Sequence, residues 1–335
     1  MHDVIVVGAG IAGVQCARRL RGAGADVLLV DRADKVGGRC ATRFFEGQAA
    51  DYGPLFIHGN DGGFLAAVGE AADAHRLEGW PQRIIGNGTP CQPESFGPRE
   101  TRLALAEGVN VVPRALASGL SVRLRTQVSA VSAADGCVRI EGAEGELFQA
   151  RDAVLAMALE QSVPFLQMLA PGSERDGALG LLELFSSLPC LTVIAGYPRG
   201  AQRLDWDVCY PEDDDALMVV GNESAKRAAG RFVILVYQAL PRWSRAWLEK
   251  PQKEWERELL MRAARRFGAW AGSPEWTHLH RWRYARLERV NELSAPLVVR
   301  VGRSRIGVAG DLFAPGGGMQ AAWISGDRLA ERLAG

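Results

Sequence analysis

The chain has 335 residues, 47% of them apolar, which is enough for a large core and favours two lobes over one. Lysine plus arginine and aspartate plus glutamate number 39 each, so net charge favours neither nucleic acid nor an acidic membrane surface as a partner. The six cysteines are scattered without a CxxC pair, and the five histidines have no ligand spacing, so we expect no disulfide framework and no metal site.

The start of the chain and its apolar runs bear on location. The first predicted strand begins almost at residue 1, which leaves no space for a signal segment. No apolar run reaches the ~18 residues that a membrane span needs. We therefore expect a cytoplasmic protein that acts on a small molecule. The sequence identifies no protein partner.

The N-terminal segment has the pattern of a βαβ unit. The apolar run Val4–Val7 predicts a buried parallel strand, and the turn GAGIAG at 8–13 leads into a predicted helix. A second apolar run, Val27–Val30, ends in Asp31. An acidic residue at this position accepts hydrogen bonds from a ribose hydroxyl. The unit predicts a dinucleotide site, and by itself it fits FAD and NAD equally well.

Each glycine of that turn has a predicted role. Gly8 allows the tight turn after the strand, Gly10 lets the backbone approach a pyrophosphate, and Gly13 lets the helix pack against the strand. The helix N-terminus then offers N–H groups and the positive end of its dipole.

A second glycine turn follows in KVGGRCATR, residues 35–43. Gly37 and Gly38 permit a turn against a nucleotide, and Arg39 has a planar charged fork suited to phosphate oxygens. Taken alone, the same residues also fit an ordinary turn with a solvated arginine. Cys40 fits either a covalent flavin thioether or a small buried neutral side chain. We expect the second, and therefore a non-covalent cofactor.

The middle of the chain contains a loop-rich segment followed by predicted helices and strands. Loops and short helices are predicted over 59–102. Predicted helices cover 109–120, 161–185 and Glu249–Phe267. Predicted strands cover 122–140 with a turn at Asp135-Gly136, then 152–158, 191–197, 216–222, 231–238 and 278–286.

The C-terminal segment again has the strand, glycine turn and helix pattern of a nucleotide-binding domain. An apolar strand precedes Gly310-Asp311, and a helix is predicted from near Met319 through Ala330. Asp311 can accept hydrogen bonds from cofactor hydroxyls, and the backbone N–H groups near Gly318–Gln320 can face a developing negative charge. We expect an α/β fold with a discontinuous Rossmann-like domain and an inserted α+β substrate domain containing a mixed sheet. The predicted FAD-binding domain comprises 1–60, 105–160 and 286–335, and the predicted substrate domain comprises 61–104 and 161–285.

These segments, in this order, resemble the flavin-dependent amine oxidase superfamily with its glutathione-reductase-like FAD fold. The matching motifs are GxGxxG, the acid after the second strand, GGRxxT, the GD segment, and a small-residue helix ending in Ser325-Gly326. The resemblance implies that Asp31 binds the adenosine ribose, Arg39 the pyrophosphate region, and Asp311 the ribityl-phosphate part. The backbone of Val128 would contact the adenine. The cofactor contacts thus expected are Gly8, Gly10, Ile11, Ala12, Gly13, Asp31, Arg32, Gly38, Arg39, Thr42, Val128, Gly310, Asp311, Gly318, Met319 and Gln320.

Within that superfamily the chain is similar to renalase and its bacterial relatives. The residues that carry this similarity are EGVNVVPRALA at 107–117, the segment 222–249, and HRWRYA at 280–285. The similarity implies hydride transfer to flavin N5 from a small electron-rich donor, with dihydronicotinamide isomers of NAD(P)H as substrates. Molecular oxygen would then reoxidise the flavin and give hydrogen peroxide.

Other functions stay open. FIHG at 56–59 is closer to polyamine-oxidase-like enzymes, so an amine or polyamine oxidase is the first alternative. An NAD-dependent dehydrogenase and a non-catalytic flavoprotein or redox-sensing module are the others.

Three residues are candidates for the catalytic site. His58 follows an apolar stretch and would lie beside the flavin, although a hydrogen-bonded loop histidine explains it as well. Arg283 and Tyr284 would border the substrate, because arginine attracts phosphate or carboxylate and aromatic rings stack on planar rings. Their neighbour Trp282 fits a core position slightly better.

Overall fold

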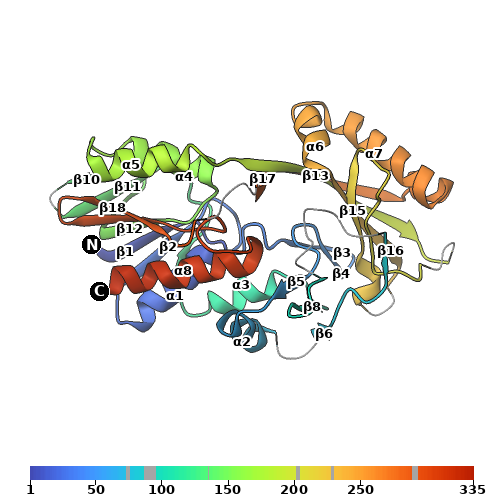
Figure 1. Cartoon of the computed structure of the whole chain (residues 1–335), viewed down its shortest axis with the longest axis horizontal. Helices are drawn as coiled ribbons and strands as arrows, with labels where there is room; N and C mark the ends of the chain where they lie inside the picture. The colour runs from blue at the N-terminus through green and yellow to red at the C-terminus, as the bar shows by residue number, and fades with distance from the viewer. Residues whose placement is uncertain (73–75, 87–95, 135, 201–203, 228–229, 289–292) are drawn as a thin grey trace.

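The computed structural model describes the chain except for residues 73–75, 87–95, 135, 201–203, 228–229 and 289–292. Two lobes lie side by side, and the segment leading into β13 crosses from one to the other (Figure 1). The predicted hairpin turn at Asp135-Gly136 lies partly outside the described residues. The flanking strands nevertheless pair antiparallel, as a hairpin requires.

The first lobe is built on an eight-stranded sheet with the order β10-β11-β12-β1-β2-β9, in which β19 also pairs with β12, and β18 with β19. The pairs β1–β2, β1–β12, β2–β9 and β12–β19 are parallel. The strands are β1 (His2–Val7), β2 (Val27–Val30), β9 (Ser121–Arg123), β10 (Val128–Ala134), β11 (Cys137–Gly142), β12 (Leu147–Leu155), β18 (Leu297–Val301) and β19 (Ser304–Val308).

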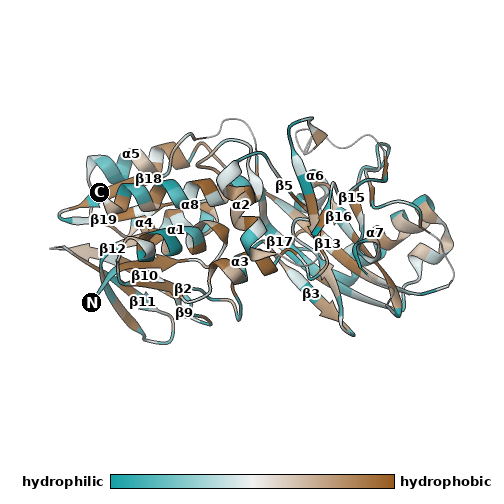
Figure 2. Cartoon of the chain, turned by 90° about the horizontal axis from the view of Figure 1, so that it is seen from below, coloured by the Kyte–Doolittle hydropathy of each residue, from teal (hydrophilic) through white to brown (hydrophobic). Residues whose placement is uncertain are grey.

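Helices cover both faces of this sheet. Successive residues of a strand point to opposite faces, so Val4 and Val6 pack with one helical layer while Ile5 and Val7 pack with the other. The first layer comprises α1 (Ile11–Gly22), α2 (Gly62–Ala71), α3 (Val111–Leu116) and α8 (Gly318–Ala334). The second comprises α4 (Leu159–Gln167) and α5 (Ser173–Leu182). The strands of this sheet are accordingly rich in apolar residues, coloured brown in Figure 2.

The second lobe is built on a six-stranded mixed sheet with the order β17-β13-β16-β15-β14-β7. Only the β14–β7 pair is parallel among the pairs described for this sheet. Its strands are β7 (Ile84–Ile85), β13 (Ser187–Pro198), β14 (Val208–Cys209), β15 (Leu217–Asn222), β16 (Phe232–Ala239) and β17 (Trp276–Leu287). Two helices, α6 (Pro241–Trp247) and α7 (Gln252–Phe267), pack on one face with the short 3₁₀ helix η3 (Ala269–Gly272).

The opposite face of that sheet meets the segments that join the lobes. They include the hairpin of β3 (Thr42–Phe45) and β4 (Gln48–Asp51), and a three-stranded sheet of β5 (Ile57–Gly59), β8 (Thr101–Leu105) and β6 (Arg76–Glu78). A 3₁₀ helix, η2 (Glu223–Lys226), follows β15. Apolar side chains of the two lobes share one core here.

The α/β class, the Rossmann-like unit and the mixed second sheet are therefore as predicted. Several bounds differ. The predicted helix Glu249–Phe267 is α7, which begins three residues later, at Gln252, because Pro251 is tolerated just before a helix but not inside one. The segments 62–71 and 161–182 lie within the predicted substrate domain, but α2, α4 and α5 pack on the first sheet, because their apolar faces complete its two cores. Within the described residues, no helix is long and apolar enough to cross a membrane.

Candidate functional site

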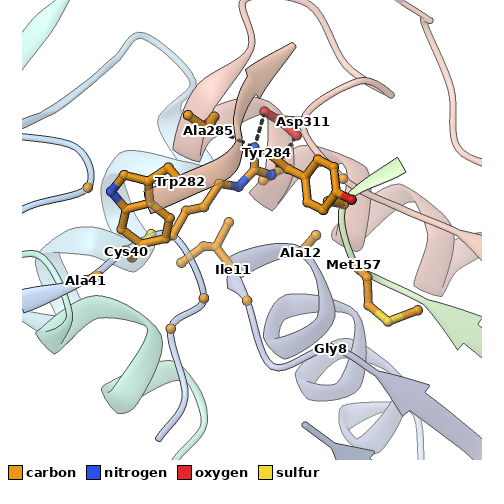
Figure 3. Close-up of a pocket in the computed structure, with 18 of the residues that line it drawn as sticks. Gly8, Ile11, Ala12, Cys40, Ala41, Met157, Trp282, Tyr284, Ala285 and Asp311 are labelled. Carbon is orange, nitrogen blue, oxygen red and sulfur yellow. Dashed lines mark hydrogen bonds and ion pairs between the residues drawn. The ribbon is translucent and has the colours of Figure 1, made fainter. Parts of the chain in front are cut away.

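A cavity of about 1140 Å³ extends between the lobes. That volume is above the roughly 300–1,000 Å³ of an ordinary small-molecule pocket, so it has room for a large ligand together with a second molecule. Its walls come from both ends of the chain and from β17. Figure 3 shows Gly8, Ile11 and Ala12 on one side, and Trp282, Tyr284 and Ala285 on the other.

The first glycine turn is shaped by close backbone contacts. Gly8 has φ +108°, and a Cβ there would lie 2.6 Å from the main-chain oxygen of Ala156. A Cβ on Gly13 would lie 1.9 Å from the oxygen of Gly8, so only glycine lets α1 approach β1. By contrast, a Cβ on Gly10 meets nothing within 4 Å. Gly10 therefore leaves open the part of the cavity that a side chain would fill.

The second glycine turn lies directly against the first. Gly37 and Gly10 form a parallel bridge, and the Gly37 N–H donates to the Ala9 oxygen at 2.8 Å. Gly37 and Gly38 have φ values of +127° and +54°, which side chains rarely adopt. Asn110, just before α3, holds this turn by donating to the oxygens of Val36 and Cys40, both at 2.9 Å.

Asp31 lies at the carboxyl end of β2 and lines the cavity. Its two carboxylate oxygens accept hydrogen bonds from the N–H of Ala9 at 2.6 Å and of Ala33 at 2.7 Å. These bonds fix the carboxylate between the two loops. Each oxygen keeps a further lone pair for a ligand hydroxyl.

Arg39 and Asp311 form a bidentate ion pair at the cavity wall. The two N···O distances are 3.0 and 2.8 Å, and Arg39 also approaches the Ala285 oxygen at 3.4 Å. Figure 3 shows Asp311 beside Tyr284, with dashed lines at its carboxylate. Asp311 raises the pKa of Arg39 above its ordinary value, against the opposing effect of burial. The sequence predicted both residues at the cofactor, but it did not predict that they bind each other.

A third glycine turn precedes α8. Gly316, Gly317 and Gly318 all have positive φ, between +62° and +90°. Gly318 opens α8, and it lines the cavity together with Met319. The helix thus presents its N-terminus to the cavity, where its N–H groups favour negative charge.

The other end of the cavity has aromatic walls. Tyr52 and Trp282 stack with ring centroids 5.5 Å apart, and His280 lies 4.1 Å from the Trp282 ring. The Trp282 indole N–H donates to the main-chain oxygen of Tyr52 at 3.0 Å, and the Gln238 amide donates to the main-chain oxygen of Gly53 at 2.6 Å. Burial, followed by His278 and Arg43, lowers the pKa of His280 to about 4. The imidazole is therefore neutral at physiological pH.

The structure brings most of the predicted site residues to the cavity. Those that line it are Gly8, Gly10, Ile11, Ala12, Asp31, Arg32, Gly38, Arg39, His58, Val128, Arg283, Tyr284, Gly310, Asp311, Gly318 and Met319. His58 also lies 3.6 Å from Glu100. The exposed guanidinium of Arg283 pairs with Glu249, so its charge is already partnered.

Three predicted cofactor contacts lie elsewhere, and each position has a physical reason. Gly13 serves the helix–strand contact. The Thr42 hydroxyl donates to Asp51 at 2.6 Å, inside the protein. The Gln320 side-chain oxygen accepts from the N–H groups of Asn60 and Asp61, at 2.7 and 2.8 Å, and so closes a loop over α8.

A charge network in which Lys226, Asp51 and Glu223 are fully buried holds the loop 52–56, which contributes Tyr52 to the aromatic wall. Lys226 lies between Asp51 at 3.1 Å and Glu223 at 2.6 Å, and Arg227 bonds the same two carboxylates at 3.1 and 2.8 Å. Lys226 also donates to the Leu55 oxygen. Burial raises the pKa of Asp51, but Lys226 and Arg227 outweigh it, so this pKa lies below its ordinary value. The only signal of this network in the sequence is that three charged residues, Glu223, Lys226 and Arg227, closely follow the predicted apolar strand 216–222.

Comparison with known proteins identifies the family of this chain. Residues 89–334, more than half of the chain, match the family model for flavin-containing amine oxidoreductase, and residues 6–68 match the NAD(P)-binding Rossmann-like domain. The chain belongs to the flavin-containing amine oxidoreductase family. The expected superfamily and its flavin cofactor are thereby confirmed, whereas the renalase-like subgroup stays a prediction.

Individual curated relatives match this chain over short segments. It is 36% identical to polyamine oxidase 1 of Oryza sativa subsp. japonica over 96 residues, which cover 24% of this chain and 19% of that protein. It is 40% identical to putrescine oxidase of Kocuria rosea over 69 residues, covering 21% and 14%. The chain thus matches less than a fifth of the length of these curated relatives.

Solved structures match over the whole fold. Putrescine oxidase bound to putrescine superposes with a TM-score of 0.74 at 15% identity, covering 99% of this chain and 98% of that one. Cyclohexylamine oxidase from Brevibacterium oxydans gives 0.73 at 16% identity with the same coverage. At such identities the likeness establishes the fold of this family member and not its substrate.

Proposed function

We propose that the chain is an FAD-dependent oxidase that accepts hydride from a small, planar, electron-rich donor, with dihydronicotinamide isomers of NAD(P)H as the favoured donor class. Molecular oxygen is the proposed final acceptor, leaving as hydrogen peroxide. FAD, when bound, supplies the hydride acceptor, and the chain binds the cofactor, orients the donor and excludes water.

The residues along the cavity fit FAD. Gly10 leaves a space that any side chain would fill, and Gly38 adjoins it. Asp31 has free lone pairs for ribose hydroxyls, and the N-termini of α1 and α8 both reach the cavity, where they favour anionic groups. Burial raises the pKa of Cys40 to about 12, so its thiol is protonated and unsuited to a covalent link. This supports a non-covalent cofactor.

The observation that carries the donor class is the composition of the aromatic end. Tyr52 and Trp282 offer flat apolar surface for a planar ring. Among the described residues lining the cavity, the carboxylates are Asp31, Asp34, Glu288 and Asp311. Asp31 and Asp34 follow β2 at the glycine-turn end, Asp311 is paired with Arg39, and Glu288 is exposed and accepts from Ser186. No described carboxylate is thus left to bind a polyamine cation at the aromatic wall.

A dihydronicotinamide donor also needs no general base, because its ring nitrogen lone pair expels the hydride directly. His280, the histidine of the aromatic wall, has a pKa lowered to about 4 and is a weak base. The proposed roles of His58, Arg283 and Tyr284 are to border the donor. Their positions along the cavity are compatible with that role.

Amine or polyamine oxidation is the second candidate, and the likeness to polyamine oxidase 1 and to putrescine oxidase favours it. Purified holoprotein, mixed anaerobically with dihydronicotinamide isomers and with a panel of amines, separates the two. We expect the dihydronicotinamides to bleach the visible flavin band and the amines to leave it unchanged. Bleaching by amines alone would establish the second candidate, and bleaching by neither would favour a non-catalytic flavoprotein.

A further inference from the structure

Arg286 lies near the end of β17 and lines the cavity. Its Nη2 lies 2.9 Å from the Met218 sulfur, which is only a weak hydrogen-bond acceptor. Among the described residues, no carboxylate or carbonyl oxygen accepts a hydrogen bond from this side chain. A guanidinium has five N–H donors, so the residues that the structure describes leave most of the donor capacity of Arg286 unused.

Three other arginines that line the cavity near β17 already have oxygen partners within the protein. Arg39 forms the bidentate pair with Asp311, and Arg283 pairs with Glu249. Arg281 donates to the Lys250 oxygen. Glu288, the acid nearest to Arg286 in the sequence, is exposed and accepts from the Ser186 hydroxyl at 3.1 Å. Within the described part of the chain, the lack of an oxygen partner thus distinguishes Arg286 from Arg281 and Arg283 on β17.

The surroundings of Arg286 make an unpaired charge unfavourable. Met218 is buried and belongs to the apolar core shared by the lobes, together with Phe56 and Tyr210. Arg286 itself is half-buried. A cation partly withdrawn from water beside such a core is favoured when an anion or strong acceptors offset the lost solvation. Burial raises the pKa of Cys190, a lining residue, and the charge of Arg286 is the largest effect that opposes it. The guanidinium is therefore close to the cavity wall.

We propose that Arg286 binds an anionic group of the hydride donor, a carboxylate or a phosphate, and so selects anionic donors over cationic amines. This inference rests on the proposed function for its donor. The planar fork of arginine matches the two oxygens of either group, and the aromatic wall of Tyr52 and Trp282 would hold the ring of the same molecule.

Ligand binding to the oxidised holoprotein tests this without turnover. Benzoate, phenyl phosphate and neutral benzamide are each titrated while the visible flavin spectrum is followed. We expect the wild type to bind one or both anions about ten- to a hundredfold more tightly than benzamide, the range for a charge-assisted hydrogen bond. The tighter of the two anions identifies the group. Equal affinity for the anions and benzamide would overturn the proposal, even without any variant.

Variants then assign the anion preference to one side chain. Arg286→Met should abolish the preference, and Arg286→Lys should retain part of it, because the charge remains but the fork is lost. Arg245→Met, at an exposed arginine of α6, is the matched control and should bind as the wild type does. A preference that persists in Arg286→Met would overturn the assignment. If Arg286→Met fails to fold, an unchanged preference in Arg286→Lys has the same meaning.

Flavin reduction by two donors that differ in charge provides a separate test. Anaerobic flavin reduction is compared for a dihydronicotinamide mononucleotide and its uncharged riboside. The Arg286→Met substitution should weaken the binding of the mononucleotide about tenfold or more and leave the riboside unchanged. If neither donor reduces the flavin, the proposed function fails, while the benzoate and phenyl phosphate titrations still decide the role of Arg286.

Discussion

Arg39 and Asp311 are 272 positions apart in the chain, yet their side chains meet in a bidentate ion pair with N···O distances of 3.0 and 2.8 Å. The pair joins the second glycine turn to the segment that precedes α8. Because each side chain orients the other, the two residues form one unit at the cavity rather than two separate contacts.

Removal of either partner should therefore weaken flavin retention. We expect Arg39→Met and Asp311→Asn each to lower the FAD-to-protein ratio after gel filtration and to reduce the free energy of unfolding by about 1–3 kcal/mol, since one group is left unsatisfied. The double variant should lose less than the sum of the single losses. Full flavin retention in Arg39→Met would exclude a role at the cofactor.

Two neighbouring glycines should respond in opposite ways. Gly10→Val should fold normally but lose the flavin, because its side chain projects into open cavity. Gly13→Ala should fail to fold, because its Cβ would lie 1.9 Å from the Gly8 oxygen. Circular dichroism and flavin absorbance of the two purified variants are the measurements. A Gly10→Val protein that retains full flavin would place the cofactor elsewhere.

The buried network predicts a large effect of one lysine. Lys226→Met leaves Asp51 and Glu223 with a single cation, and losing one partner of a buried ion pair lowers the free energy of unfolding by about 3–5 kcal/mol. Lys253→Met is the matched control. Lys253 is exposed and pairs with Glu256, so its loss should change the value by about 1 kcal/mol or less. Urea unfolding measures the free energy of unfolding of both variants. Equal losses in Lys226→Met and Lys253→Met would contradict the stabilising role of the buried network.

His280 predicts a pH dependence of stability. Its folded pKa, about 4, lies below the ordinary 6.5, so the folded state prefers the neutral imidazole. The contribution of neutral His280 to the free energy of unfolding is complete above pH 6.5, and it is lost as the pH falls from about 6.5 toward about 4. The melting temperature of His280→Phe should fall less over this window than that of the wild type. His2→Gln, at the surface pair with Asp26, is the control and should follow the wild type.

Local sequence pattern determined much of the nucleotide half of the site. Gly8, Gly13, Gly37 and Gly38 hold backbone geometries that a side chain would disturb, so a short motif is sufficient to reveal them. Asp31 lies where the length of a βαβ unit puts it. Such features depend on residues close in the chain, and the family match confirms the fold and flavin class that they indicated.

The contacts at the aromatic end of the cavity were decided only by tertiary structure. Tyr52 and Trp282 stack across 230 positions, and Lys226 reaches Asp51 across 175. Arg286 differs from Arg283 only in what surrounds it, since one guanidinium meets a carboxylate and the other a buried thioether. No local pattern distinguishes these two arginines. The partner of a charge depends on how distant segments of the chain pack, and a local sequence pattern does not contain that information.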